Sequence, residues 1–446
     1  MLNHRRTRFA RRNFLKYSAA TGLAASVAGS RFGAPALAAN GPLHFATWSA
    51  VVDLVKSHVN AFEQETGLTV NYSNSPWAQY RETMITNFVG GAPLDVLWVS
   101  DSWLPEWADA GWIAPVDDFE ELMKYNDEVA EFCVESMTYK GNQYGLTYYT
   151  DYMGFLYDEA KLEEAGITEP PQTWQQLTEQ AAQIKEQGIA EFPLMLALAQ
   201  ESWLIEFLSA MVFSHGGRFV NEEGAAVMQQ EQGGAVEALR WVVDAVNQHG
   251  IVSPACVEVG ELTGLKAFAS GQHAFALEPK YRLSMLNDPD QSQIAGRVKQ
   301  ALMPMGPNGS HATVGWMRFH GMTTQGREDE ERAANAARLI EWFGGKANGE
   351  YLFQKLLFLD IGAGFGVEAL FDDPEIRAAY NKFADVDMVQ RQQELAQKKD
   401  VISPWFGEWD EANGALWQQA ILKQTSPEEA MASSAEVWDE LREELG

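Results

Sequence analysis

The sequence predicts an α/β protein built as two compact units, and three observations support this prediction. The chain has 446 residues, of which 46% are hydrophobic, so it is long enough for two to three domains with sizeable cores. Residues 43–72 have the pattern of a strand, a helix and a second strand. An aromatic run over residues 140–158 has the pattern of one strand that leaves one unit and enters another.

The first 39 residues have the features of an export leader. They contain seven Lys or Arg residues and no acidic residue. Residues 10–16, ARRNFLK, resemble the twin-arginine export motif, a modestly apolar stretch follows at 17–30, and residues 36–38 supply an Ala-Leu-Ala cleavage site. We therefore expect a twin-arginine signal peptide over residues 1–39 that is cleaved near Ala38. The alternative is an amphipathic or disordered basic tail.

The remainder of the chain is strongly acidic. The formal charge of the whole chain is −29, and removal of the seven positive leader residues leaves −36. Such a body repels nucleic acid and anionic membranes, so neither is expected as a partner. The two cysteines, Cys133 and Cys256, are far apart in sequence and are expected to be separate buried thiols. No apolar run after the leader reaches the ~18 residues of a membrane helix, and we expect a free, soluble, monomeric protein in the periplasm.

The chain after the leader opens with a predicted strand, helix and strand. Residues 43–48 form a short apolar run, and apolar residues then recur at steps of three, four and three from Val52 to Phe62, which is the period of a helix. Gly67 marks the end of this helix, because glycine is common just beyond a helix C-terminus. Residues 68–72 form the next strand. This order predicts two parallel strands joined by a right-handed crossover.

A second buried strand, residues 94–99, is followed directly by Asp101, Ser102 and Trp103. In open α/β sheets, ligands bind outside the carboxyl ends of the strands. An acid, a hydroxyl and an indole at this place are therefore candidate ligand groups. The alternative is a helix capped by Asp101 or Ser102 with Trp103 packed against it, and the two roles are compatible.

The central stretch, residues 140–158, has the sequence KGNQYGLTYYTDYMGFLYD. Gly141 and Asn142 predict a hairpin turn at its start. Asp151 lies in the middle of the aromatic run, and a carboxylate among aromatic rings suits a hydroxylated ligand with apolar faces. A half-buried edge strand with Asp151 at a solvated turn accounts for the same pattern.

The segment after this strand resembles a known family. Residues 162–177, LEEAGITEPPQTWQQL, are similar to a signature of the extracellular solute-binding proteins of sugar ABC transporters, the maltose-binding-like family. Residues 62–70, 90–99, 107–115 and 265–277 are also similar to segments of that family, in the same order. Each match is loose by itself, whereas the order and spacing together are difficult to obtain by chance.

The resemblance implies a two-lobed periplasmic binding protein fold of type II, in which each lobe is a mostly parallel sheet flanked by helices. Residues 40–149 and 304–343 would form the N-terminal lobe, and residues 150–303 and 344–446 the C-terminal lobe. Three hinge crossings are expected at these limits. The family function would be the capture of a sugar, here a neutral di- or oligosaccharide, between the lobes and its delivery to an ABC transporter permease. Neither catalysis nor a cofactor is expected.

The remaining elements follow from apolar periodicity and from the family segments. Thr173 is a typical N-cap residue for the helix that it precedes. Residues 362–366, GAGFG, lack the strand and distant acid of a dinucleotide-binding fingerprint and are expected to form a loop. Further helices are expected over 173–187, 203–213, 236–246 and 333–343, and strands over 193–198 and 298–303, the latter as the return crossing.

Candidate ligand residues are those whose chemistry suits a sugar and which fall at predicted strand ends or crossings. Aromatic rings cover the apolar faces of a sugar, and carboxylates accept hydrogen bonds from its hydroxyls. For each tryptophan the alternative is packing in the core. The candidates are Trp48, Asp101, Ser102, Trp103, Asp151, Glu201, Trp203, Glu278, Gly315, Trp316, Arg318 and Trp405.

Two other functions are compatible with the sequence. A secreted carbohydrate-active enzyme would also use the twin-arginine route, although no catalytic motif singles out a pair of carboxylates. A binding protein of the same fold could take another solute. A ferric ion would need clustered tyrosines such as Tyr148, Tyr149 and Tyr152, and a phosphate ester would need an arginine such as Arg318. No metal site is expected from the histidines, which are scattered.

Overall fold

The computed structural model describes residues 41–201, 203–231 and 233–445. The predicted leader and its cleavage site lie outside the described residues. The two expected cysteine thiols are confirmed, since Cys133 and Cys256 are both buried and free. Burial raises the pKa of each thiol to about 12.

The N-terminal lobe is built on the strand order β2-β1-β3, followed by β11 and β7. As predicted, β1 pairs in parallel with β2 and also with β3. Gly67, with a φ of 72°, closes the first helix as expected. The elements that form this lobe before the long crossing strand are β1 (Leu43–Trp48), α1 (Val52–Thr66), β2 (Val70–Ser75), α2 (Trp77–Gly90), β3 (Val96–Ser100), α3 (Leu104–Asp109), β4 (Ile113–Ala114), α4 (Glu120–Met123), α5 (Glu131–Ser136), β5 (Thr138–Tyr139) and β6 (Asn142–Gln143).

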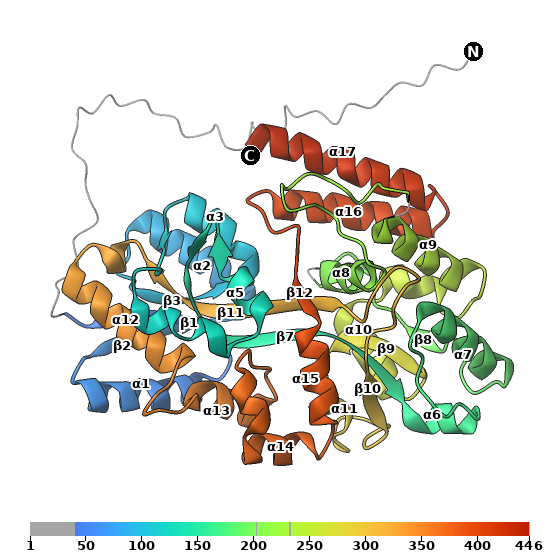
Figure 1. Ribbon diagram of the computed structural model, residues 1–446, viewed down its shortest axis with the longest axis horizontal. Coiled ribbons are helices and arrows are strands. Elements are labelled where there is room, and N and C mark those ends of the chain that lie inside the picture. Colours follow the sequence, from blue (N-terminus) through green and yellow to red (C-terminus); the bar gives the residue numbers. More distant parts are fainter. Residues whose placement is uncertain (1–40, 202, 232, 446) are drawn as a thin grey trace. The chain divides into compact units, whose positions relative to one another are not determined.

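One strand, β7 (Gly145–Asp158), runs through both lobes (Figure 1). Its first half pairs with β11 (Thr313–Thr323), and its second half pairs with β9 (Phe275–Pro279) and β10 (Val298–Ala301). The prediction of a strand shared by two units is therefore confirmed. The predicted hairpin before it is also present, because β5 and β6 pair in an antiparallel manner.

The return crossing differs from the prediction. The strand β10 pairs only with the second half of β7, so it stays in the C-terminal lobe, and β11 carries the chain back to pair with β3. The sheets are mixed rather than mostly parallel. The strand β7 is antiparallel to β9, β10 and β11, and β11 is antiparallel to β3. The parallel pairs are β1 with β2 and with β3, β8 (Leu194–Met195) with β9, and β11 with β12 (Ala396–Lys398).

The C-terminal lobe surrounds β8 and β9 with helices. Thr173 caps the helix that follows it, as predicted, since its hydroxyl accepts a hydrogen bond from the Gln176 N–H at 3.1 Å. Every described side chain of α8 is buried. The helices of this lobe are α6 (Glu159–Glu164), α7 (Trp174–Glu186), α8 (Leu204–Ser214), α9 (Gly234–Asn247), α10 (Glu261–Ala269), α11 (Arg282–Leu286), α16 (Phe406–Ile421) and α17 (Pro427–Leu445).

The third crossing lies later in the chain than the expected limit at Gly344. Helix α12 (Glu330–Gly344) is followed by α13 (Leu352–Ile361), which packs on the N-terminal lobe through Phe353, whose ring lies 5.2 Å from that of His58. Residues 362–366 then form the expected loop. The chain continues through α14 (Pro374–Tyr380), α15 (Val386–Glu394) and β12 (Ala396–Lys398), which pairs with β11.

Candidate ligand-binding site

An aromatic pocket with a volume of about 320 Å³ opens where the carboxyl ends of β1 and β3 face the beginning of α8 and α11. Its walls come from both lobes and from both crossing strands. We call this cavity the aromatic pocket. The residues that line it are Trp48, Ala50, Val51, Trp77, Trp98, Tyr148, Tyr149, Trp203, Tyr281, Trp316, Arg318, Leu357, Ile361 and Ala363.

The rings of the N-terminal lobe form one continuous wall. Trp48, the last residue of β1, meets Trp98 at a centroid distance of 4.6 Å and Trp77 at 4.9 Å, both edge-on. Tyr148 stacks on Trp98 at 4.3 Å. Edge-on and offset contacts of this kind are the favoured geometries of aromatic pairs, so these rings hold one another in place.

Two tryptophans meet where the lobes face each other. Trp203 directly precedes α8 of the C-terminal lobe, and Trp316 lies on the crossing strand β11. Their rings lie 5.3 Å apart at 82°. Tyr149 accepts a hydrogen bond from the Trp316 ring N–H at 3.4 Å. Aromatic side chains from both lobes thus border a single cavity.

One cation lines the aromatic pocket. The Arg318 guanidinium donates through Nη1 to Asp101 Oδ1 at 3.0 Å, and it lies 5.4 Å from the ring centre of Trp77. Burial alone would raise the pKa of Asp101, but Lys399 and Arg318, together with backbone N–H donors, hold that pKa below its usual value. Asp101 is therefore an ionised partner that holds the arginine at the pocket wall.

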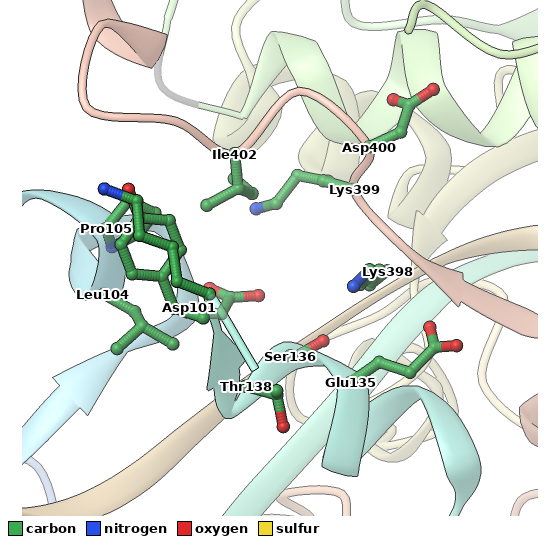
Figure 2. Close-up of a pocket in the computed structure, with 12 residues that line it drawn as sticks. Asp101, Leu104, Pro105, Glu135, Ser136, Thr138, Lys398, Lys399, Asp400 and Ile402 are labelled. Atoms are coloured by element: carbon green, nitrogen blue, oxygen red, sulfur yellow. The ribbon is translucent and has the colours of Figure 1, made fainter. Parts of the chain in front are cut away.

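A buried ion pair connects the lobes next to Asp101. Lys399 extends from the segment after β12 toward Asp101, as Figure 2 shows. Its ammonium donates to Glu206 of α8 at 2.8 Å and to the Ser102 hydroxyl at 3.2 Å. Burial would lower the pKa of Lys399, but Glu206 and Asp101 raise it above its usual value. Lys399 thus links the residues after β3 to helix α8 through a hydrogen bond and an ion pair.

The structure brings four of the predicted site residues into the aromatic pocket. These are Trp48, Trp203, Trp316 and Arg318. The three candidates after β3 do not line the pocket, but they contact residues at or next to its wall. Asp101 and Ser102 make the polar contacts described above, and Trp103 stacks on Trp77 at 5.1 Å without lining the pocket.

Three other candidates are packed inside the protein. Asp151 is fully buried, 3.7 Å from the Lys280 ammonium, and burial raises its pKa to about 6 against the opposing effect of Lys280. Glu278 is also buried, and its desolvation raises its pKa well above the usual value. A Cβ on Gly315 would lie 2.5 Å from the Phe132 ring, so this glycine makes room for α5.

The last two candidates lie at other cavities. Glu201 is exposed and accepts a hydrogen bond from the Glu261 N–H at 3.3 Å. Trp405 packs against Trp438 and lines a separate cavity of about 760 Å³. The structure therefore does not gather these residues with the aromatic pocket.

Several pocket residues were not among the candidates. Trp98 and Tyr148 are almost fully buried in strands, where a ring that borders a cavity has the same sequence pattern as a core ring. Trp77 follows a Ser-Pro pair at the end of β2. A position just after a strand is typical of ligand-binding residues, so the sequence could have indicated Trp77. The three tyrosines proposed for iron do not converge, because the Tyr152 hydroxyl donates to the Val389 carbonyl, away from the pocket lining.

Two further features are absent from the described residues. No group of three or more His, Cys, Asp or Glu residues there has the arrangement of a metal site. No helix within the described part of the chain is long and apolar enough to span a membrane.

The fold and the interlobe pocket define the class of protein. Residues 45–350 match the bacterial extracellular solute-binding protein family. The chain belongs to this family, and its fold is the two-lobed fold of periplasmic binding proteins.

The individual proteins that resemble this chain have low sequence identity to it. An inferred binding protein of Brucella abortus (strain 2308) is 25% identical over 264 residues, and this match spans 57% of the present chain and 60% of the relative, less than two thirds of its length. The sugar-binding protein MalE from Xanthomonas citri has a similar structure, with a TM-score of 0.75 and 18% identity over 90% of this chain and 97% of that one. Maltose-bound T. maritima MalE3 gives a TM-score of 0.72 with 22% identity, covering 90% and 100% of the two chains.

Proposed function

We propose that this protein is the substrate-binding component of an ABC transporter and that it captures a sugar in the aromatic pocket. The observation that carries the proposal is the contact between Trp203 and Trp316, because it brings aromatic rings from the C-terminal lobe and from a crossing strand to one cavity. Rings that line several walls of one cavity can cover the apolar faces of a sugar. The sugar-bound proteins that share this fold support the same conclusion.

Binding is coupled to lobe closure in this proposal. A ligand that contacts both lobes stabilises the conformation in which they are close together, since it has more contacts there than in the open one. The closed protein then docks on the membrane permease and releases the sugar. In the same proposal the protein reaches the periplasm through the twin-arginine translocase, loses its leader near Ala38 and acts as a monomer without a cofactor.

The pocket does not favour the alternative of a carbohydrate-active enzyme. Hydrolysis of a glycosidic bond commonly uses two carboxylates on opposite sides of the bond. Within the described residues, none of the side chains that line the aromatic pocket is an aspartate or a glutamate. The lining therefore offers surfaces for binding rather than groups for proton transfer.

A thermal-shift screen of the purified protein against mono-, di- and oligosaccharides tests the proposal. A sugar at ~100-fold above its dissociation constant should add about 2.7 kcal/mol to the free energy of unfolding. Calorimetry then gives the affinity of each sugar that raises the melting temperature. If no sugar raises it while amino acids, metal ions or phosphate do, the proposed ligand class is wrong.

A further inference from the structure

The aromatic pocket has an unusual polar composition for a neutral sugar site. A neutral sugar presents hydroxyls that donate as well as accept, and ionised carboxylates are strong acceptors for them. Within the described part of the chain, the pocket lining contains no Asp, Glu, Asn or Gln side chain. Its polar side-chain groups are the Arg318 guanidinium, the indole N–H groups and the tyrosine hydroxyls. The lining is therefore rich in donors and poor in strong acceptors.

Some N–H donors of Arg318 have no hydrogen-bond partner among the described residues. Its Nη1 is occupied by Asp101 at 3.0 Å and by the Met317 carbonyl at 2.8 Å. No hydrogen bond to any described residue engages its Nε or its Nη2, although a guanidinium carries five N–H donors. The side chain is only 11% exposed and lines the pocket. An arginine held in this way presents an unused donor edge beside the aromatic rings.

The buried walls hold further unused donors. The Trp98 ring N–H and the Tyr148 hydroxyl are both buried and have no hydrogen-bond partner among the described residues. An unpaired buried polar group costs free energy until a partner reaches it. Asp101, the carboxylate that pairs with Arg318, also interacts with Lys399. A ligand in the aromatic pocket with acceptor groups would meet these donors.

We propose that the ligand is an acidic saccharide, a sugar that carries a carboxylate, and that the free edge of Arg318 binds this carboxylate. This inference rests on the proposed function and replaces the neutral sugar expected from the sequence. The planar fork of a guanidinium matches the two oxygens of a carboxylate. The sugar ring lies among Trp48, Trp203 and Trp316, which supply apolar surface for its C–H faces.

Matched acid and neutral sugars test the inference on the purified protein. The probes are D-glucuronic acid against D-glucose, D-galacturonic acid against D-galactose, and digalacturonic acid against galactobiose, with D-glucose 6-phosphate as the phosphate arm. Calorimetry should show at least one acid that binds ten or more times as tightly as its neutral partner. The comparison uses the unaltered protein, so it does not depend on the folding of a variant.

Substitution of Arg318 tests the assignment to this residue. A hydrogen bond to a charged group contributes more than one between neutral groups. Arg318→Gln should therefore weaken binding of the acid about tenfold to a hundredfold and should weaken binding of the neutral partner clearly less. Arg318→Lys keeps the charge without the fork and should recover part of the loss. The matched control is Arg81→Gln, since Arg81 also pairs with a carboxylate, Glu106 at 2.5 Å, and does not line the pocket.

The outcomes separate the inference from the proposed function. Neutral sugars that bind as tightly as their acids overturn the inference and leave the proposed function intact. Stronger binding of the phosphate than of every carboxylate overturns the carboxylate assignment. An acid preference that persists in Arg318→Gln removes Arg318 from the site. If no saccharide of either kind binds, the proposed function fails, and the inference fails with it.

Discussion

The two tryptophans that meet in the aromatic pocket differ in exposure. Trp316 is 1% exposed and ranks among the largest fully buried side chains, whereas Trp203 is only partly buried at the start of α8. The loss of a buried aromatic side chain leaves a cavity, and the loss of a partly exposed one mainly removes a contact surface. The two residues can therefore be separated by experiment.

We predict that Trp203→Ala weakens sugar binding about tenfold or more and changes the melting temperature of the ligand-free protein little. Trp316→Ala should weaken binding as well, but it should also destabilise the protein by about 3–5 kcal/mol, the usual cost for a buried aromatic residue. Calorimetry gives the affinity, and urea denaturation gives the stability.

Trp112→Ala is the matched control for this pair. Trp112 is also partly buried, stacks on Phe88 at 5.0 Å and does not line the pocket. It should leave the affinity unchanged. Full affinity in Trp203→Ala would remove that residue from the site.

At the level of single residues, sequence position identified some pocket residues and could not identify others. Trp48 and Trp203 were found because they fall at strand or helix ends, where ligands of α/β sheets bind. Asp151 was a candidate because it lies among aromatic residues at the predicted crossing, but Lys280, which directly follows β9, pairs with it in the interior. Nothing in the sequence reveals such a partner, because the pairing depends on which strands become neighbours.

At the level of elements, the segment after β12 and helix α16 place charges beside α8. Asp410 of α16 is partly buried. Burial, together with the nearby Glu206 carboxylate, raises the pKa of Asp410 to about 7, although Lys399 opposes this shift. An aspartate in an unfolded chain titrates near ~3.9. Between about pH 4 and 7, Asp410 therefore keeps its proton in the folded protein and has lost it in the unfolded chain.

It follows that Asp410 lowers stability as the pH rises through this window. We predict that Asp410→Asn removes this decrease, so that the variant gains stability over the unaltered protein between pH 4 and 7, with no further gain above pH 8. Melting temperatures measured from pH 4 to 8 test this. Glu411→Gln, a change at the exposed neighbouring residue, should follow the unaltered protein. A constant difference between Asp410→Asn and the unaltered protein at all pH values would contradict the assignment.

The loop after α13 passes close to the long crossing strand. A Cβ on Gly364 would lie 2.0 Å from the Thr150 carbonyl oxygen of β7 and 2.8 Å from the Lys280 ammonium. We predict that Gly364→Ala destabilises the protein by about 1–3 kcal/mol or more, because the crossing must move away to admit the methyl group. Denaturation by urea measures the difference.

Gly407→Ala is the control for this substitution. Gly407 lies in the first turn of α16, and no atom lies within 4 Å of the position that an added methyl group would take, so alanine should be neutral or slightly stabilising there. Equal stability of the two variants would mean that the crossing tolerates displacement.

The elements themselves were predictable where the local pattern was strong. The long strand β7 and the β1-α1-β2 opening follow from periodicity and from the glycine at the end of α1. The sequence did not show that β10 stays in the C-terminal lobe or that α13 packs on the N-terminal one. Both segments are apolar enough to fit either lobe, and their partners, such as Phe155 for β10 and His58 for α13, are distant in sequence.

At the level of the whole molecule, the proposed twin-arginine leader over residues 1–39 can be tested through the location of the protein. We predict that replacement of Arg11 and Arg12 by lysine strands the protein in the cytoplasm, because the twin-arginine pair is the recognised part of such a leader. Cell fractionation measures this, and the intact mass of the exported protein should show cleavage near Ala38. Unchanged export of the variant would indicate the general secretion route.

The central claim is that a sugar binds between two lobes and draws them together. Small-angle scattering of the purified protein, with and without a saturating sugar found by the thermal-shift screen, tests this claim most directly. We predict a smaller radius of gyration in the sugar-bound protein, and in Trp203→Ala we predict that this decrease requires a sugar concentration about tenfold or more higher. A sugar that raises the melting temperature but leaves the radius of gyration unchanged or larger would contradict the claim.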